Sequence, residues 1–177
     1  MSSRPAVFFD RDGVINRRIV GGYVRRPAEF ELLPGFAELL ELVRSHNCLA
    51  IVITNQQGVG KQLMSLADLT RVHAHLQSLP ALSAPAFDGF YSCTSLASTP
   101  NNARKPSPHM LQLALRRWNI DPAASWMIGD SATDIEAGRA AGLRTIGVHL
   151  HDAAATAPDH LASDLTEVRA ILAAHLG

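Results

Sequence analysis

The sequence predicts an α/β fold: a doubly wound, Rossmann-like parallel sheet flanked by helices, with no separate cap domain. Five short apolar segments alternate with amphipathic or capped stretches, as in a chain built from alternating strands and helices. Four polar sets follow these segments, and in an open parallel sheet they would meet beyond the carboxyl ends of the strands. The 177 residues, 47% of them hydrophobic, can fill one substantial core. We therefore expect a single domain over residues 1–177.

The apolar segments are predicted to be strands because they are short, rich in β-branched or aromatic residues, and followed by polar or turn residues. In chain order they cover residues 6–9, 49–53, 87–91, 126–128 and 145–148. Their nearly continuous apolar character is typical of strands that are covered on both faces, which favours a parallel sheet.

Helix signals lie between and after these strands. The predicted helices cover residues 35–45, 65–78, 107–118, 131–141 and 165–176. Ser65 and Asp68 resemble a capping box, and the pair Ser107 and Pro108 is typical of a helix start. Ser131 is placed as the N-cap of the fourth helix.

The first polar set is a pair of acidic residues, Asp10 and Asp12, directly after the first strand. Residues i and i+2 of an extended chain project to the same side, so both carboxylates can face one space. Two such carboxylates repel unless a divalent cation lies between them, or unless one is held as an acid while the other stays an anionic nucleophile. A simple turn is the alternative, because Asp and Gly also favour turns.

The other three sets are weaker when each is taken alone. Thr54 and Asn55 end the second strand, Arg104 and Lys105 precede the third helix, and Asp130 follows the fourth strand. Each has a structural alternative, namely a turn, a solvated cation pair or a helix cap. Their common place at strand ends favours a phosphate or metal site.

Taken in order, these sets resemble the four motifs of the haloacid dehalogenase superfamily of phosphohydrolases. The motifs read Asp10-Arg11-Asp12-Gly13, Thr54-Asn55, Lys105, and Gly129-Asp130-Ser131 with Asp134. Further matches resemble the branch that contains heptose bisphosphate and histidinol-phosphate phosphatases: Asn16, Gly22-Tyr23, Leu33-Pro34-Gly35, Gln56, Arg104-Lys105-Pro106 and His109-Met110. The resemblance spans residues 7–148.

The resemblance and the chemistry of phosphoryl transfer imply the same catalytic roles. Asp10 would attack phosphorus, and Asp12 would protonate the leaving oxygen and then activate water. Thr54 and Lys105 would stabilise the phosphoryl group. Asp10, the backbone carbonyl of Asp12, and Asp130 would supply hard oxygen ligands, which suit Mg²⁺. Asp134 is expected to position these ligands.

Substrate contacts are expected from residues that flank the catalytic motifs. Asn55 would donate to phosphoryl oxygens, and Arg104 has a planar fork suited to a second anionic or hydroxylated part of the substrate. The remaining predicted substrate-binding residues are Arg11, Gly22, Tyr23, Gln56 and Gln57.

Relatives in this branch often contain a zinc loop, and this chain departs from that pattern. The loop would have the form Cys-x-His, a spacer, then Cys-x-Cys before Arg-Lys-Pro. In this chain Cys93 matches the first cysteine of the pattern, but Ser95 stands at the histidine position. Asn101 and Ala103 stand at the positions of the other two cysteines. One sulfur cannot form a structural zinc site, so we expect no zinc.

Composition argues against several other classes of protein. Sixteen basic and sixteen acidic side chains cancel, which leaves no electrostatic footprint for nucleic acid or an anionic membrane. The apolar runs are too short to span a bilayer, and two cysteines fit a reducing compartment. We expect a cytoplasmic monomer that acts on a small phosphorylated molecule.

These expectations combine into a Mg²⁺-dependent phosphatase that acts through an aspartyl phosphate. The favoured substrate is a phosphorylated sugar such as D-glycero-D-manno-heptose 1,7-bisphosphate, cleaved at the 7-phosphate. Histidinol phosphate is the alternative substrate. A nonenzymatic phosphate-binding module is the alternative of another class, although binding alone does not require the second carboxylate, Asp12.

Overall fold

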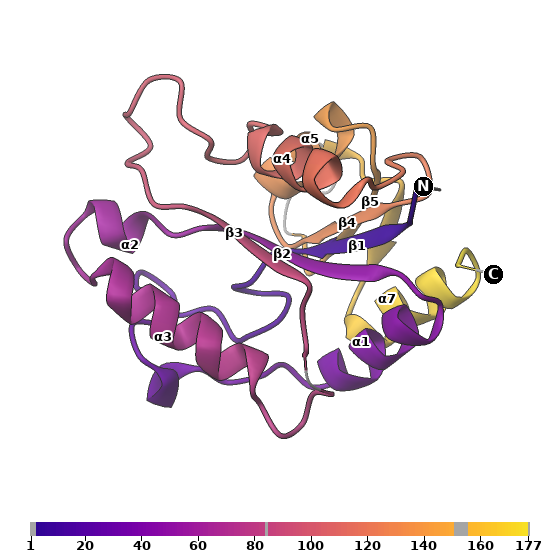
Figure 1. Cartoon of the computed structure of the whole chain (residues 1–177), viewed down its shortest axis with the longest axis horizontal. Helices are drawn as coiled ribbons and strands as arrows, with labels where there is room; N and C mark the ends of the chain where they lie inside the picture. Colours follow the sequence, from indigo (N-terminus) through magenta and orange to yellow (C-terminus); the bar gives the residue numbers. More distant parts are fainter. Residues whose placement is uncertain (1–2, 84, 151–155, 177) are drawn as a thin grey trace.

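A computed structural model describes residues 3–83, 85–150 and 156–176, and within them the chain forms one six-stranded parallel sheet (Figure 1). The strand order is β3-β2-β1-β4-β5-β6. The strands are β1 (Ala6–Phe9), β2 (Leu49–Asn55), β3 (Gly89–Cys93), β4 (Trp126–Gly129), β5 (Arg144–Val148) and β6 (His160–Ala162). The strand order reverses direction at β1, which therefore lies at the switch point where such sheets bind ligands. The predicted fold class is confirmed.

The five predicted helices are all present, with slightly shorter bounds. They are α1 (Phe36–Ser45), α3 (Leu66–Gln77), α4 (His109–Trp118), α5 (Ala132–Ala140) and α7 (Leu165–Ala173). The sequence analysis missed β6, the short helix α2 (Gln57–Gly60) and the 3-10 turn η1 (Pro27–Glu29). Segments of three or four residues are too short for a hydrophobic period to reveal them.

Capping side chains fix the starts of two helices beside the crevice. The hydroxyl of Ser65 accepts from the backbone N–H of Asp68 at 3.1 Å, and the Asp68 carboxylate accepts from the backbone N–H of Ser65 at 2.8 Å. At α5, the Asp134 carboxylate accepts from the backbone N–H of Ser131 at 3.1 Å and from its hydroxyl at 2.6 Å. The second capping box places Asp134 at the end of β4, which positions it for the site.

Two helical layers cover the sheet, one on each face (Figure 1). Val7 and Phe9 of β1 pack in the cluster that contains residues of α1 and α7, whereas Ala6 and Phe8 pack in the cluster with residues of α4 and α5. Every residue of β1 is fully buried, so the strand is held rigidly from both sides. A rigid β1 fixes where the residues after Phe9 point.

The stretches between the catalytic motifs contain short elements in the described residues. Between β1 and β2 lie η1 and α1, and between β2 and β3 lie α2 and α3. No helix among the described residues has the length and apolar character that crossing a membrane requires.

Candidate active site

The predicted polar sets meet in one cavity of about 690 Å³ at the carboxyl ends of the strands. Asp10 follows β1, Thr54 and Asn55 end β2, and Lys105 approaches from the segment before α4. The loop after β1 and the segment around α2 form the outer parts of the cavity wall. Groups that lie far apart in sequence therefore share one space, as their positions at strand ends predict.

Lys105 is the electrostatic centre of this site. Its buried ammonium lies 2.7 Å from Asp10 Oδ1 and 2.5 Å from Asp134 Oδ1, and it donates to the Ile53 carbonyl at 2.9 Å. Burial alone would lower the pKa of Lys105, but the two carboxylates outweigh burial and raise it. The side chain is therefore a fixed positive charge beside Asp10.

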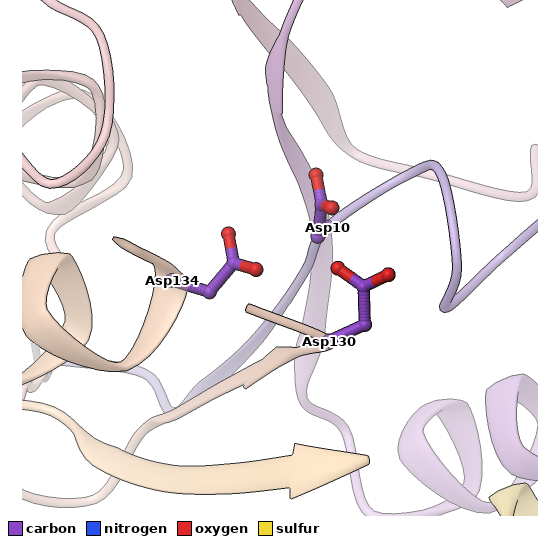
Figure 2. Close-up of side chains that lie close together, drawn as sticks. All are labelled: Asp10, Asp130 and Asp134. Carbon is purple, nitrogen blue, oxygen red and sulfur yellow. The ribbon is translucent and has the colours of Figure 1, made fainter. Parts of the chain in front are cut away.

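Three carboxylates face a common point next to this lysine (Figure 2). One ligand oxygen from each of Asp10, Asp130 and Asp134 lies within 4.8 Å of the others. Burial raises the pKa of Asp10 to about 7 and that of Asp130 to about 6, and the neighbouring carboxylates add to both shifts. Such crowding of acidic groups is relieved by a cation.

The donor set fits a hard divalent cation such as Mg²⁺. All three groups offer carboxylate oxygen, and Asp130 Oδ1 is buried without a hydrogen-bond partner among the described residues. Asp134 Oδ2 accepts from the Ser131 hydroxyl, and Asp134 Oδ1 contacts the Lys105 ammonium. This arrangement suits Asp134 to positioning its neighbours. Asp10 and Asp130 are the predicted ligands that the structure brings together.

Two glycines allow these carboxylates to approach the backbone. A Cβ atom on Gly13, whose φ is +100°, would lie 2.0 Å from Asp130 Oδ2. A Cβ atom on Gly129 would lie 2.1 Å from the Cβ of Asp134. Any side chain at either position would displace an acidic group of the site, because real contacts are never this short.

Asp12 points into a separate hydrogen-bond network. Its carboxylate accepts from Arg11 at 2.9 Å, from Asn16 at 3.0 Å and from Gln56 at 2.9 Å. Burial acts to raise the pKa of Asp12, but the Arg11 charge and the three donors prevail and lower it. In this arrangement Asp12 is held as an anion, and it also borders the cavity.

Arg11 and Gln56, two of the residues predicted to bind substrate, are not among the residues that line the cavity. Both are fully buried behind the cavity wall. The Arg11 guanidinium lies between His73 and Asp12: its Nη1 is 3.4 Å from His73 Nε2, and its Nη2 donates to the Asp12 carboxylate at 2.9 Å. Gln56 donates to Thr54 Oγ1 at 2.8 Å as well as to Asp12. Both residues therefore hold the Asp12 carboxylate in position, and Gln56 also holds the Thr54 hydroxyl.

The other predicted substrate-binding residues do line the cavity: Gly22, Tyr23, Asn55, Gln57 and Arg104. The Asn55 amide is already engaged, because its oxygen accepts from the Lys105 backbone N–H at 3.0 Å and its nitrogen donates to the Lys105 carbonyl at 3.3 Å. Asn55 thus ties the end of β2 to the segment that contains Lys105.

Sequence reasoning missed two cations on the cavity wall, Arg18 and Lys61. Arg18 lies 3.2 Å from Asp130 Oδ2. No sequence pattern distinguishes Lys61 from an ordinary surface cation, whereas Arg18 had a weak signal. The adjacent basic pair Arg17 and Arg18, in a loop that follows a catalytic motif, was the available signal.

The loop over residues 94–103 is closed by an amide side chain. Asn102 donates to the carbonyls of Thr99 at 2.5 Å and Leu96 at 3.4 Å, and it accepts from the Arg104 backbone N–H at 2.8 Å. The loop sequence contains no Cys, His, Asp or Glu. Its side chains therefore offer none of the usual zinc ligands.

Comparisons with known proteins agree with this geometry. A family model described as HAD-hydrolase-like matches residues 102–168. The D-glycero-alpha-D-manno-heptose-1,7-bisphosphate 7-phosphatase of Mycobacterium tuberculosis H37Rv is 44% identical, over 73% of this chain and 69% of its own. The D-glycero-D-manno-heptose-1,7-bisphosphate 7-phosphatase of Chlorobaculum tepidum is 34% identical, over 93% of this chain and 92% of its own.

Solved structures share the fold. The D,D-heptose 1,7-bisphosphate phosphatase from B. bronchiseptica, complexed with magnesium and phosphate, matches with a TM-score of 0.83 at 24% identity, over 96% of this chain and 98% of its own. The corresponding protein from Burkholderia thailandensis matches with a TM-score of 0.68 at 27% identity, over 96% and 99%. By its fold, its motifs and these relatives, the chain belongs to the haloacid dehalogenase-like hydrolases and is a phosphatase, a hydrolase of phosphoric monoesters.

Proposed function

We propose that this protein is a Mg²⁺-dependent D-glycero-D-manno-heptose 1,7-bisphosphate 7-phosphatase that works through an aspartyl phosphate on Asp10. The arrangement of Asp10 supports this most strongly: a carboxylate at the end of the central strand, 2.7 Å from a buried lysine ammonium. The names of the relatives support the substrate.

The first chemical step transfers the phosphoryl group to the protein. An oxygen of Asp10 forms a bond to phosphorus while the bond from phosphorus to the sugar oxygen breaks. The Lys105 ammonium offsets the negative charge of the phosphoryl oxygens, and the Thr54 hydroxyl donates a hydrogen bond to one of them. Asp12, protonated for this step, gives its proton to the leaving sugar oxygen, which departs as an alcohol.

The second step returns the enzyme to its starting state. A water molecule attacks phosphorus, the bond to Asp10 breaks, and Asp12 takes the proton from that water. Arg11, Asn16 and Gln56 stabilise Asp12 as the anion that this half of the cycle requires. Inorganic phosphate then leaves the cavity.

The proposed cofactor would be held by Asp10 and Asp130, with Asp134 beside them, and the Asp12 carbonyl would be a further ligand. When bound, Mg²⁺ supplies positive charge that offsets the phosphate dianion and the crowded carboxylates. We propose that no zinc is bound, since the loop over residues 94–103 offers no zinc-binding side chain.

A second anionic group on the substrate suits the outer cavity better than a cationic one. Arg104 lines the wall and forms no ion pair with a described carboxylate. Histidinol phosphate would instead bring an ammonium group toward this cation, which costs repulsion. The sugar bisphosphate is therefore the preferred substrate over histidinol phosphate. An enzyme is preferred over a binding module, because three side chains hold the Asp12 carboxylate in position and binding alone does not require that group.

We further propose a cytoplasmic monomer that acts on the free metabolite and uses neither nucleic acid nor membrane. The balanced charge of the chain supports this proposal, with sixteen basic and sixteen acidic side chains.

Phosphate release tests the function directly. With Mg²⁺, the purified protein should hydrolyse heptose 1,7-bisphosphate with a kcat/KM well above that for histidinol phosphate, and phosphorus NMR should show the 1-phosphate remaining on the sugar. A higher kcat/KM for histidinol phosphate, or retention of the 7-phosphate, would contradict the proposal.

A further inference from the structure

The cations on the described cavity wall differ in what neutralises them. Lys105 contacts two carboxylates, and Arg18 contacts Asp130. Lys61 and Arg104 line the same cavity, and neither forms an ion pair with a described carboxylate. Two unneutralised cations on one cavity wall form a potential well for an anion beyond the catalytic centre.

Lys61 is held at this wall by Tyr23. Its ammonium lies 5.8 Å from the centroid of the Tyr23 ring, within the range of a cation–π interaction. The ring in turn lies against Gly58, where an added Cβ would come within 2.9 Å of the Tyr23 Cγ. The loop after β1 and the helix α2 are therefore joined through the Tyr23 ring, which lies against Gly58 and near the Lys61 ammonium.

Lys61 and Thr54 lie on different elements of the cavity wall. Thr54 ends β2, and Lys61 directly follows α2, where its backbone N–H donates to the Gln57 carbonyl at 2.9 Å. Lys61 is therefore separated from the end of β2 along the chain by Gln56 and the four residues of α2. Lys61 thus suits a substrate group that is remote from the phosphate being transferred.

We propose that Lys61 is a specificity-determining residue that, together with Arg104, binds the second phosphate of a bisphosphorylated sugar, and that Tyr23 positions it. This inference rests on the proposed function, which supplies a substrate with two phosphates. A phosphate monoester is close to a dianion at neutral pH, so two cations match its charge. Arg104 offers a planar fork, and Lys61 adds a compact point charge from the segment that follows α2.

The test compares the affinities of a sugar bisphosphate and a sugar monophosphate. Calorimetry with hexose 1,6-bisphosphate and hexose 6-phosphate, in Mg²⁺ and in an Asp10→Asn background that prevents turnover, gives a preference ratio. We expect the bisphosphate to bind more tightly to the parent. Lys61→Gln should lower the ratio about tenfold, and Lys61→Arg should restore most of it.

Two further variants test the role of the ring. Tyr23→Phe keeps the ring and should keep the ratio, whereas Tyr23→Ala removes it and should lower the ratio as Lys61→Gln does. A parent without measurable preference for the bisphosphate, or a ratio that Lys61→Gln leaves unchanged, overturns the inference. A ratio that Tyr23→Ala leaves unchanged overturns the positioning role.

Failure of the inference and failure of the proposed function give different results. If the wild-type protein releases no phosphate from heptose 1,7-bisphosphate while the ratio still depends on Lys61, the proposed substrate is wrong and the second phosphate site stands. If phosphate is released normally and the ratio is independent of Lys61, only the inference is wrong.

Discussion

Adjacent residues in this site have separate tasks, and Arg104 and Lys105 illustrate this. Lys105 is buried against Asp10, whereas Arg104 lines the outer cavity. Arg104→Ala should raise KM for the sugar bisphosphate about tenfold, corresponding to about 1.4 kcal/mol, and change kcat for an aryl phosphate little. Lys105→Ala should impair the hydrolysis of both. Steady-state kinetics on the two substrates would contradict this division if Arg104→Ala lowered kcat equally for each.

Side-chain direction explains which single residues could be predicted. Alternation along an extended chain placed Asp10 and Asp12 near one cavity, and the structure has both on its wall. The same rule would have set the residue between them apart, and in the structure Arg11 is fully buried and outside the cavity lining. Gln56 lies after β2, where the alternation ends, so its inward direction could not be read from spacing.

At the scale of elements, the loop over residues 94–103 depends on Asn102. The Asn102 amide joins two loop carbonyls to the Arg104 backbone. Asn102→Ala should cost about 1 kcal/mol of stability and raise KM for the sugar bisphosphate several-fold by loosening Arg104. Ser98→Ala, at an exposed position of the same loop, is the matched control. Equal kinetics for both variants would show that Asn102 does not position Arg104.

The helix α3 links pH to stability through His73, which stacks on Phe90 and lies beside Arg11. Burial, and then the Arg11 charge, lower the pKa of His73 from 6.5 to about 4. The unfolded chain therefore binds this proton first, and stability is lost as pH falls from 6.5 to 4. The loss from this group is at most about 3 kcal/mol.

His73→Gln should remove this part of the pH dependence. Chemical denaturation of the wild type and the variant at pH 7, 5.5 and 4 measures the difference in their free energies of unfolding. That difference should shift in favour of the variant as pH falls, and a difference that stays constant across the range would show that His73 does not couple protonation to folding.

Across the whole molecule, the sheet and its main helices follow from sequence because each has a capped start or a buried apolar run. The elements that were missed are the shortest: β6, α2 and η1. Of these, α2 matters most for the cavity, since Gln57 at its start and Lys61 directly after its end both line the wall. A four-residue helix and a single surface lysine leave no periodic pattern in the sequence. This part of the site could therefore be found only from the structure.

Metal binding should stabilise the whole protein in a pH-dependent way. The pKa values of Asp10 and Asp130 are raised in the folded state, to about 7 and about 6. Their contribution to the stability of the metal-free protein is full below about pH 4 and is lost as pH rises through these values. Mg²⁺ offsets that loss, so the increase in Tm on adding Mg²⁺ should grow from pH 5 to pH 8.

Calorimetric scans with Mg²⁺ and with a chelator check this expectation, and chelation should also stop turnover until Mg²⁺ is restored. An increase in Tm that is independent of pH would contradict the assigned carboxylates.

Elemental analysis of the purified protein should find no stoichiometric zinc, and about one zinc per chain would contradict our interpretation of the loop over residues 94–103.

The central claim is that Asp10 becomes phosphorylated, and Asp12→Asn makes this measurable. An aryl alcohol leaves without needing a proton, whereas hydrolysis of the aspartyl phosphate needs the base, so the intermediate should accumulate in this variant. After acid quenching of Asp12→Asn with Mg²⁺ and an aryl phosphate, mass spectrometry should find a phosphoryl group on the peptide that contains Asp10, and Asp10→Asn should show none. Release of aryl alcohol without that modification, or a phosphoryl group on another residue, would contradict the account.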